Sequence, residues 1–149
     1  MGRMDVWSKP FVLALLVMGF WLTPTFAAEP VGYQAAQVLA QQGKWGALLQ
    51  AAQTAHEQNP NDARWQLLLG VAQAQTQRLG QARTTFENMT KRYPELPEGH
   101  NNLGLVLAAL GKPAEAKQAF EQALRANPGF DLAKKNLTWL APTPVRATP

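Results

Sequence analysis

The side chains that most enzymes use for catalysis are scarce in this sequence. The 149-residue chain has no cysteine and only two histidines, His56 and His100. Its single serine, Ser8, lies close to the N-terminus, so the rest of the chain lacks the two commonest nucleophiles. Neither histidine stands at metal-ligand spacing from a carboxylate. We therefore expect two structural histidines, no metal site, no cofactor and no enzymatic activity.

The acidic residues and glycines also favour structural roles. Glu95 and Glu98 flank the start of an expected helix, where negative charge stabilises the helix dipole, so paired-carboxylate catalysis is the weaker interpretation. No glycine-rich phosphate loop is present. The net charge of +4 is spread thinly along the chain, which argues against nucleic acid as a partner.

The N-terminus has the three-part pattern of an export signal. Arg3 and Lys9 supply positive charge, and an apolar run of 12 residues follows at Phe11–Leu22. Pro24 then interrupts the run, and Thr25–Ala27 offers small residues for cleavage. This order predicts a secretory signal peptide.

The predicted signal peptide covers residues 1–27, which places the start of the mature chain at Ala28. The apolar run is shorter than the roughly 20 residues that span a bilayer. We therefore expect export to the bacterial periplasm. The alternative is an uncleaved N-terminus that anchors the protein in the inner membrane, facing the periplasm, as its only membrane contact.

The remaining sequence repeats every 34 residues. Pro60, Pro94 and Pro128 are equally spaced, and proline stops helices. The pair Leu69-Gly70 recurs as Leu103-Gly104 at the same interval, without a gap. The same spacing relates two further pairs, Ala82 with Ala116 and Phe86 with Phe120. Good helix formers dominate and isoleucine is absent, so the sequence predicts helices rather than strands.

Packing explains the pattern within each repeat. Glycine and alanine let two helices approach, and large residues at spacings of three and four fill the space between them. Tight turns are expected at 43–45, 77–79 and 111–113, with Pro113 opening a second helix. Asp62 and Asp131 are predicted to cap the helices that follow the loops.

A 34-residue unit with Leu-Gly, then Ala-x3-Phe, then Pro resembles the tetratricopeptide repeat (TPR). The resemblance implies an all-α, right-handed solenoid of about three helix-turn-helix units and a capping helix. The units are expected at 29–62, 63–96 and 97–130, the capping helix at 131–140, and a disordered Pro/Thr-rich tail at 141–149. Four positions depart from the family pattern: Gly32, Gln66 and His100 replace its opening aromatic, and Ala52 its second-helix aromatic.

The remaining candidate site is a groove lined by the first helix of each unit. Its exposed stripe should recur at three- and four-residue spacing and is mostly apolar or neutral amide, which suits a peptide or an amphipathic helix. The alternative for Leu67, Val71 and Leu105 is a core contact between neighbouring hairpins. The predicted groove residues are Tyr33, Gln37, Arg64, Leu67, Val71, Gln75, Asn101, Leu105 and Ala108.

Some members of the family hold a peptide's C-terminal carboxylate with Lys, Arg and Asn on this stripe. The matching positions here are Tyr33, Gln37, Leu68, Glu98 and Asn102, of which only the last fits. The resemblance therefore does not imply a carboxylate-clamp adaptor.

The predicted function is that of a non-enzymatic scaffold or adaptor in the periplasm, which binds a partner protein through its groove. One alternative is a membrane-tethered factor for envelope assembly or secretion. Another is a glycan-binding module that stacks sugars on Trp45, Trp65 and Trp139, although single aromatic residues more often pack in the core. The identity of the partner, the pathway and the oligomeric state stay open at this stage.

Overall fold

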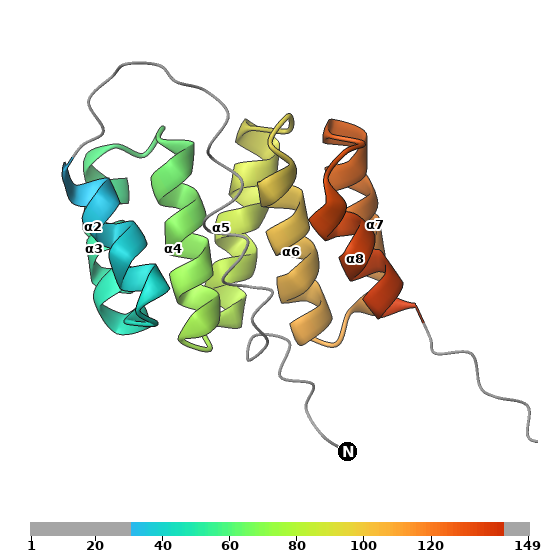
Figure 1. Cartoon of the computed structure of the whole chain (residues 1–149), viewed down its shortest axis with the longest axis horizontal. Coiled ribbons are helices and arrows are strands. Elements are labelled where there is room, and N and C mark those ends of the chain that lie inside the picture. The colour runs from blue at the N-terminus through green and yellow to red at the C-terminus, as the bar shows by residue number, and fades with distance from the viewer. Residues whose placement is uncertain (1–30, 142–149) are drawn as a thin grey trace, which may run out of the picture.

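The computed structural model describes residues 31–141, which form seven helices and no strand. The helices follow one another as α2 (Val31–Gln41), α3 (Trp45–Gln58), α4 (Ala63–Gln75), α5 (Leu79–Arg92), α6 (Pro97–Ala109), α7 (Pro113–Ala126) and α8 (Asp131–Leu140). Helices α2 to α7 form three antiparallel hairpins that follow one another along the long axis of the molecule (Figure 1). Helix α8 packs against α7 and α6 at the far end. The predicted all-α solenoid is confirmed.

The turn inside each hairpin has the same backbone geometry in all three units. Its central residue has a positive φ: 68° at Gly43, 64° at Gln77 and 75° at Gly111. Each of these residues donates its N–H to a carbonyl three residues back, and the next residue donates to a carbonyl five residues back, at 2.8–3.1 Å. This paired bonding satisfies carbonyls that a helix end otherwise leaves open.

The loops between hairpins also repeat at the 34-residue interval. The amide of Asp62 donates to the carbonyl three residues before it, and so do the amides of Leu96 and Phe130. Only Asp62 adds a side-chain cap, accepting from the Arg64 amide at 2.9 Å. The predicted cap at Asp131 is wrong, because this residue is the first of α8 and Phe130 holds the cap position.

In the second and third hairpins, a phenylalanine ring of the second helix packs over a glycine of the first helix. A Cβ added to Gly70 would lie 2.5 Å from the ring of Phe86, and one added to Gly104 would lie 2.5 Å from the ring of Phe120. Both rings are fully buried. The glycines and phenylalanines that recur at the 34-residue interval therefore pack on each other, with backbone approaching ring at a distance that excludes any side chain on the first helix.

The first hairpin uses a different pair at the same positions. Ala36 stands where the other units have glycine and Ala52 where they have phenylalanine, and both are fully buried. A large ring still packs against the first helix of this hairpin, but it comes from the next unit: the ring of Trp65 lies 3.8 Å from a Cβ built on Gly32. Leu103 packs against both hydrophobic clusters, one centred on α2 to α5 and the other on α6 to α8, which makes the core continuous.

The predicted signal peptide at 1–27 lies outside the described residues, and so does the predicted tail beyond Ala141. Among the helices from α2 to α8, none combines the length and hydrophobicity that crossing a bilayer requires.

Candidate functional site

The first helices of the units, α2, α4 and α6, lie side by side with α8, and we call the surface they share the inner face. The sequence-predicted groove residues all lie on these helices, but they differ in burial. Five are buried: Tyr33, Leu67, Val71, Asn101 and Leu105. Four are half-buried: Gln37, Arg64, Gln75 and Ala108.

The apolar members of this set belong to the hydrophobic core. Leu67 and Val71 pack within the cluster of the first two hairpins, and Leu105 packs within the C-terminal cluster. These side chains therefore make the contact between neighbouring hairpins that the sequence left open as an alternative. Their contact with a partner stays a prediction.

Polar side chains on α6 form the most unusual part of the inner face. Asn101 is fully buried, and its Oδ1 accepts a hydrogen bond of 2.8 Å from Nδ2 of Asn136 on α8. Asn101 Nδ2 and Asn102 Oδ1 are buried with no hydrogen-bond partner. Buried polar groups are nearly always paired in folded proteins, so an open donor beside an open acceptor requires an explanation.

Glu98 lies one turn before these two asparagines and is also buried. Burial raises the pKa of its carboxyl, and a hydrogen bond from its own backbone amide offsets part of that shift. The inner face of α6 therefore disfavours additional negative charge.

At the α2 end of the inner face, aromatic and charged residues form one cluster. The rings of Tyr33 and Trp65 meet edge to face with centroids 5.4 Å apart, and the guanidinium of Arg64 lies 5.1 Å from the Tyr33 centroid. Arg64 also forms an ion pair of 2.9 Å with Asp62. Partial burial works to raise the pKa of the Asp62 carboxyl, but the hydrogen bonds from Arg64 outweigh it and hold that pKa below its usual value.

Two residues of the inner face were missed by the sequence reasoning. Asn136 contacts Asn101, and Trp65 contacts Tyr33. A signal existed for the first, because Asn136 stands 34 residues after Asn102. The sequence offers Trp65 as a sugar platform, but this residue is buried and its ring meets that of Tyr33 edge to face, so it is not available to stack a sugar.

The two histidines lie apart, on different helices. His56 is half-buried on α3, and its Nδ1 has no hydrogen-bond partner. His100, on α6, forms a hydrogen bond of 3.0 Å between its Nε2 and the carbonyl oxygen of Pro94. In residues 31–141 no three His, Asp or Glu side chains are grouped so that they could bind a metal ion.

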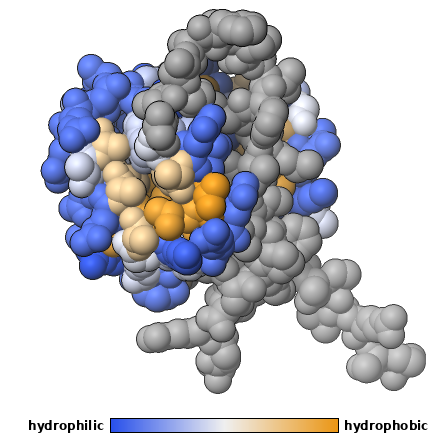
Figure 2. Space-filling view, turned by 60° about the vertical axis from the view of Figure 1, so that its left-hand side comes forward, coloured by the Kyte–Doolittle hydropathy of each residue, from blue (hydrophilic) through white to orange (hydrophobic). Residues whose placement is uncertain are grey.

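Apolar side chains also gather at the end of the array that carries α2 and α3, where hydrophilic residues surround them (Figure 2). Val38 of α2 is 46% exposed, the highest value among the large apolar residues of the described part. This surface belongs to the end of the solenoid rather than to its inner face.

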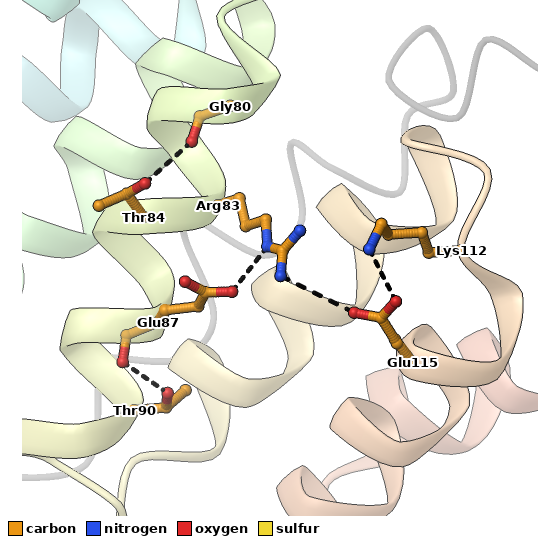
Figure 3. A network of polar contacts seen from close by, with 7 residues as sticks. All are labelled: Gly80, Arg83, Thr84, Glu87, Thr90, Lys112 and Glu115. Atoms are coloured by element: carbon orange, nitrogen blue, oxygen red, sulfur yellow. Dashed lines mark hydrogen bonds and ion pairs between the residues drawn. The ribbon is translucent and has the colours of Figure 1, made fainter.

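A chain of ion pairs joins the second hairpin to the third on the side of the second helices (Figure 3). Arg83 of α5 pairs with Glu87 at 2.6 Å and reaches Glu115 of α7 at 3.9 Å. Glu115 also pairs with Lys112 at 2.8 Å, and hydrogen bonding to Lys112 lowers the pKa of this carboxyl. These side chains are half-exposed, so each pair contributes little to the free energy of folding.

Two family models described as tetratricopeptide repeat match the chain, one over residues 33–97 and the other over residues 97–130. No curated protein matches it.

Several solved structures share the fold. The first TPR domain of the human RPAP3 protein is 17% identical, with a TM-score of 0.69 over 74% of this chain and 87% of that one. The second TPR domain of human RPAP3, in complex with the HSP70 peptide SGPTIEEVD, is 19% identical, with a TM-score of 0.69 over 75% and 93%. The Yersinia enterocolitica type III secretion chaperone SycD, in complex with a peptide of the translocator YopD, is 19% identical, with a TM-score of 0.65 over 73% and 83%.

Proposed function

Because this chain is a solenoid of tetratricopeptide repeats, we propose that it is a non-enzymatic scaffold that binds a peptide or helix of a partner protein on its inner face. Two of the similar structures hold a peptide of another protein, which supports this class of function. Both matching family models describe a repeat of this kind, and neither indicates an enzyme family.

The observation that carries the proposal is the open donor and acceptor on α6. Asn101 Nδ2 and Asn102 Oδ1 are buried, unpartnered and adjacent in sequence. A peptide main chain offers one carbonyl and one N–H per residue, which are the partners these two atoms lack. Both atoms are covered in the free protein, so a peptide has to displace the side chains over them; pairing would then remove the cost of leaving them unpaired, about 1–3 kcal/mol for each group.

The ligand's contact here is a main-chain amide rather than a terminal carboxylate. Glu98 stands at one of the positions where carboxylate-binding members of the family have a cation, and its pKa is raised by burial. A second carboxylate beside it would add like-charge repulsion. We therefore expect an internal segment of the partner to bind, not an acidic C-terminus.

Site-specific photo-crosslinking in the native cells tests this proposal. The reactive group belongs at Ala108, which is half-buried on α6, with a matched control at Gln81, which is exposed on α5. A discrete partner band from Ala108 alone supports the inner face. Equal bands from both positions, or no band from Ala108, would refute it.

Once the partner is identified, its affinity tests the amide contact. Asn102→Ala removes the open acceptor without breaking a hydrogen bond of the fold, so the Kd should rise by about tenfold. Asn88→Ala, an exposed change on α5, serves as the control. An unchanged affinity for Asn102→Ala would exclude the amide contact.

For the location, we propose the periplasm, on the basis of the predicted signal peptide. N-terminal sequencing of the protein from fractionated cells is the test. A mature N-terminus at Ala28 in the periplasmic fraction supports export with cleavage. An intact segment 1–27 in the membrane fraction supports the tethered alternative instead.

A further inference from the structure

The C-terminal end of the solenoid has an open surface between α7 and α8. A hollow of about 430 Å³ is lined there by Pro113, Ala114, Lys117 and Glu121 of α7 and by Leu137 and Leu140 of α8. We call this surface the end hollow. Its floor is apolar, and Lys117 and Glu121 form an ion pair of 3.8 Å at its rim.

The 34-residue repeat shows what fills the equivalent space inside the molecule. Counting back 34 residues, Leu137 and Leu140 correspond to Leu103 and Val106 of α6. In that internal junction the equivalent residues contact α7, since Leu103 packs against the cluster that contains Phe120 and Arg83 reaches Glu115, whereas Leu137 and Leu140 remain half-buried. One unit earlier, α5 covers the corresponding face of α4 in the same way. The end hollow therefore occupies the position that the second helix of the next hairpin covers inside the array.

The charges at the rim repeat as well. Lys117 and Glu121 stand 34 residues after Arg83 and Glu87, and both sets form an (i, i+4) ion pair. In the internal junction Arg83 also reaches Glu115, in the first turn of the covering helix (Figure 3). Lys117 is 65% exposed, so it is free to make the same contact with an incoming helix.

One position sets the size of the side chain that the incoming helix can bring. In the third hairpin Gly104 accepts the ring of Phe120, whereas in the first hairpin alanine stands at both equivalent positions, Ala36 and Ala52. The corresponding residue of α8 is Thr138, which is exposed and bonded only to its own helix, at the carbonyl of Lys134. A threonine leaves no room for a ring at that depth, so the covering helix needs a small residue there.

We propose that the end hollow docks an amphipathic helix of a partner protein, with an acidic residue in its first turn and a small residue at the position equivalent to Phe120. The apolar floor, the exposed Lys117 at the rim and the repeat register all indicate this occupant. The proposal does not rest on the inner face, which lies on other surfaces of the helices.

The probe is a peptide with the sequence of α7, Pro113–Ala126, in which alanine replaces Phe120. A hydrocarbon staple between the positions of Gln118 and Gln122, both exposed in α7, keeps it helical. Calorimetric titration into the full chain should show saturable binding. Absence of saturation below about 1 mM would overturn the proposal.

Location is tested by blocking the hollow. Ala114 is exposed at its rim, so Ala114→Trp should fill the hollow without disturbing the fold and abolish binding of the peptide. Gln122→Trp, on the same helix but outside the hollow, should bind like the wild-type chain. Equal affinity of the two variants would overturn the assignment.

Two complementary changes test recognition. Lys117→Glu should weaken binding about fivefold, and a peptide with lysine in place of Glu115 should restore it. The unaltered α7 peptide, which keeps Phe120, should bind the wild-type chain about tenfold more weakly than the alanine peptide, and Thr138→Gly should remove that difference. Failure of both rescues would exclude the proposed register.

Discussion

Single glycines decide how closely the two helices of a hairpin approach. We expect Gly104→Ala to lower the free energy of unfolding by about 1–3 kcal/mol, because the new Cβ would lie 2.5 Å from the ring of Phe120. Urea denaturation followed by circular dichroism measures the change.

The matched control is Gly80→Ala on α5, where a Cβ meets nothing within 4 Å. This change should leave stability unchanged or raise it by up to about 1 kcal/mol, since alanine is the better helix former. A Gly104→Ala variant as stable as the control would show that the ring moves aside freely.

Glu98 gives the stability a pH dependence of its own. Burial raises its pKa in the folded state above the ordinary 4.5, so ionised Glu98 destabilises the fold at neutral pH. Between 4.5 and the raised folded-state pKa, the folded chain binds more protons than the unfolded chain, and this contribution to stability therefore grows as the pH falls through that window.

Glu98→Gln should accordingly raise the melting temperature at pH 7. It should also reduce the increase in stability that mild acidification gives the wild-type protein. Thermal unfolding of both proteins between pH 4.5 and 7 measures it. Glu95→Gln is the control, since Glu95 is exposed. A parallel pH profile for Glu98→Gln and the wild type would contradict the assigned burial effect.

At the scale of the elements, the hairpin turns contain one residue that does not suit its backbone. Gln77 has a φ of 64° where the other two units have glycine. A non-glycine residue with a left-handed backbone is strained by about 1 kcal/mol. Glycine relieves this strain, but its greater freedom in the unfolded chain offsets part of the gain in stability. We expect Gln77→Gly to raise the free energy of unfolding by about 0.5 kcal/mol, measured by urea denaturation. Gly111→Gln, the reverse change, should lower it, and equal stabilities would refute the argument.

The turns and caps also show what a repeat predicts and where it misleads. Spacing alone located the hairpin turns and the recurring glycines and phenylalanines, because the turn geometry and the approach of backbone to ring repeat at fixed intervals. The predicted cap at Asp131 is wrong, because in the 34-residue register Asp62 corresponds to Phe130, one residue before Asp131. An aspartate near a helix start therefore predicts a cap only when it also stands at the register position of the cap.

At the scale of the whole molecule, the fold followed from the sequence and the details of the inner face did not. The periodicity of α4 and α6 identified which residues lie on that face, but not how deep they lie. Leu67, Val71 and Leu105 are core residues because the neighbouring hairpin covers them, and that depends on how the hairpins are placed in space. The hydrogen bond between Asn101 and Asn136 arises from the same placement, since it joins residues 35 positions apart.

The linear arrangement of the hairpins predicts how stability is distributed along the chain. Helices α4 and α6 have a neighbour on both sides and nine buried residues each, whereas α8 has one, Ala133. In solenoids each unit is stabilised by its neighbours, so the ends open before the middle. Hydrogen exchange should therefore be slowest in α4 and α6 and fastest in α2 and α8.

Binding of the stapled α7 peptide should slow hydrogen exchange in α8 and leave exchange in α2 unchanged. Uniform exchange across all seven helices would instead mean that the described part unfolds as one unit.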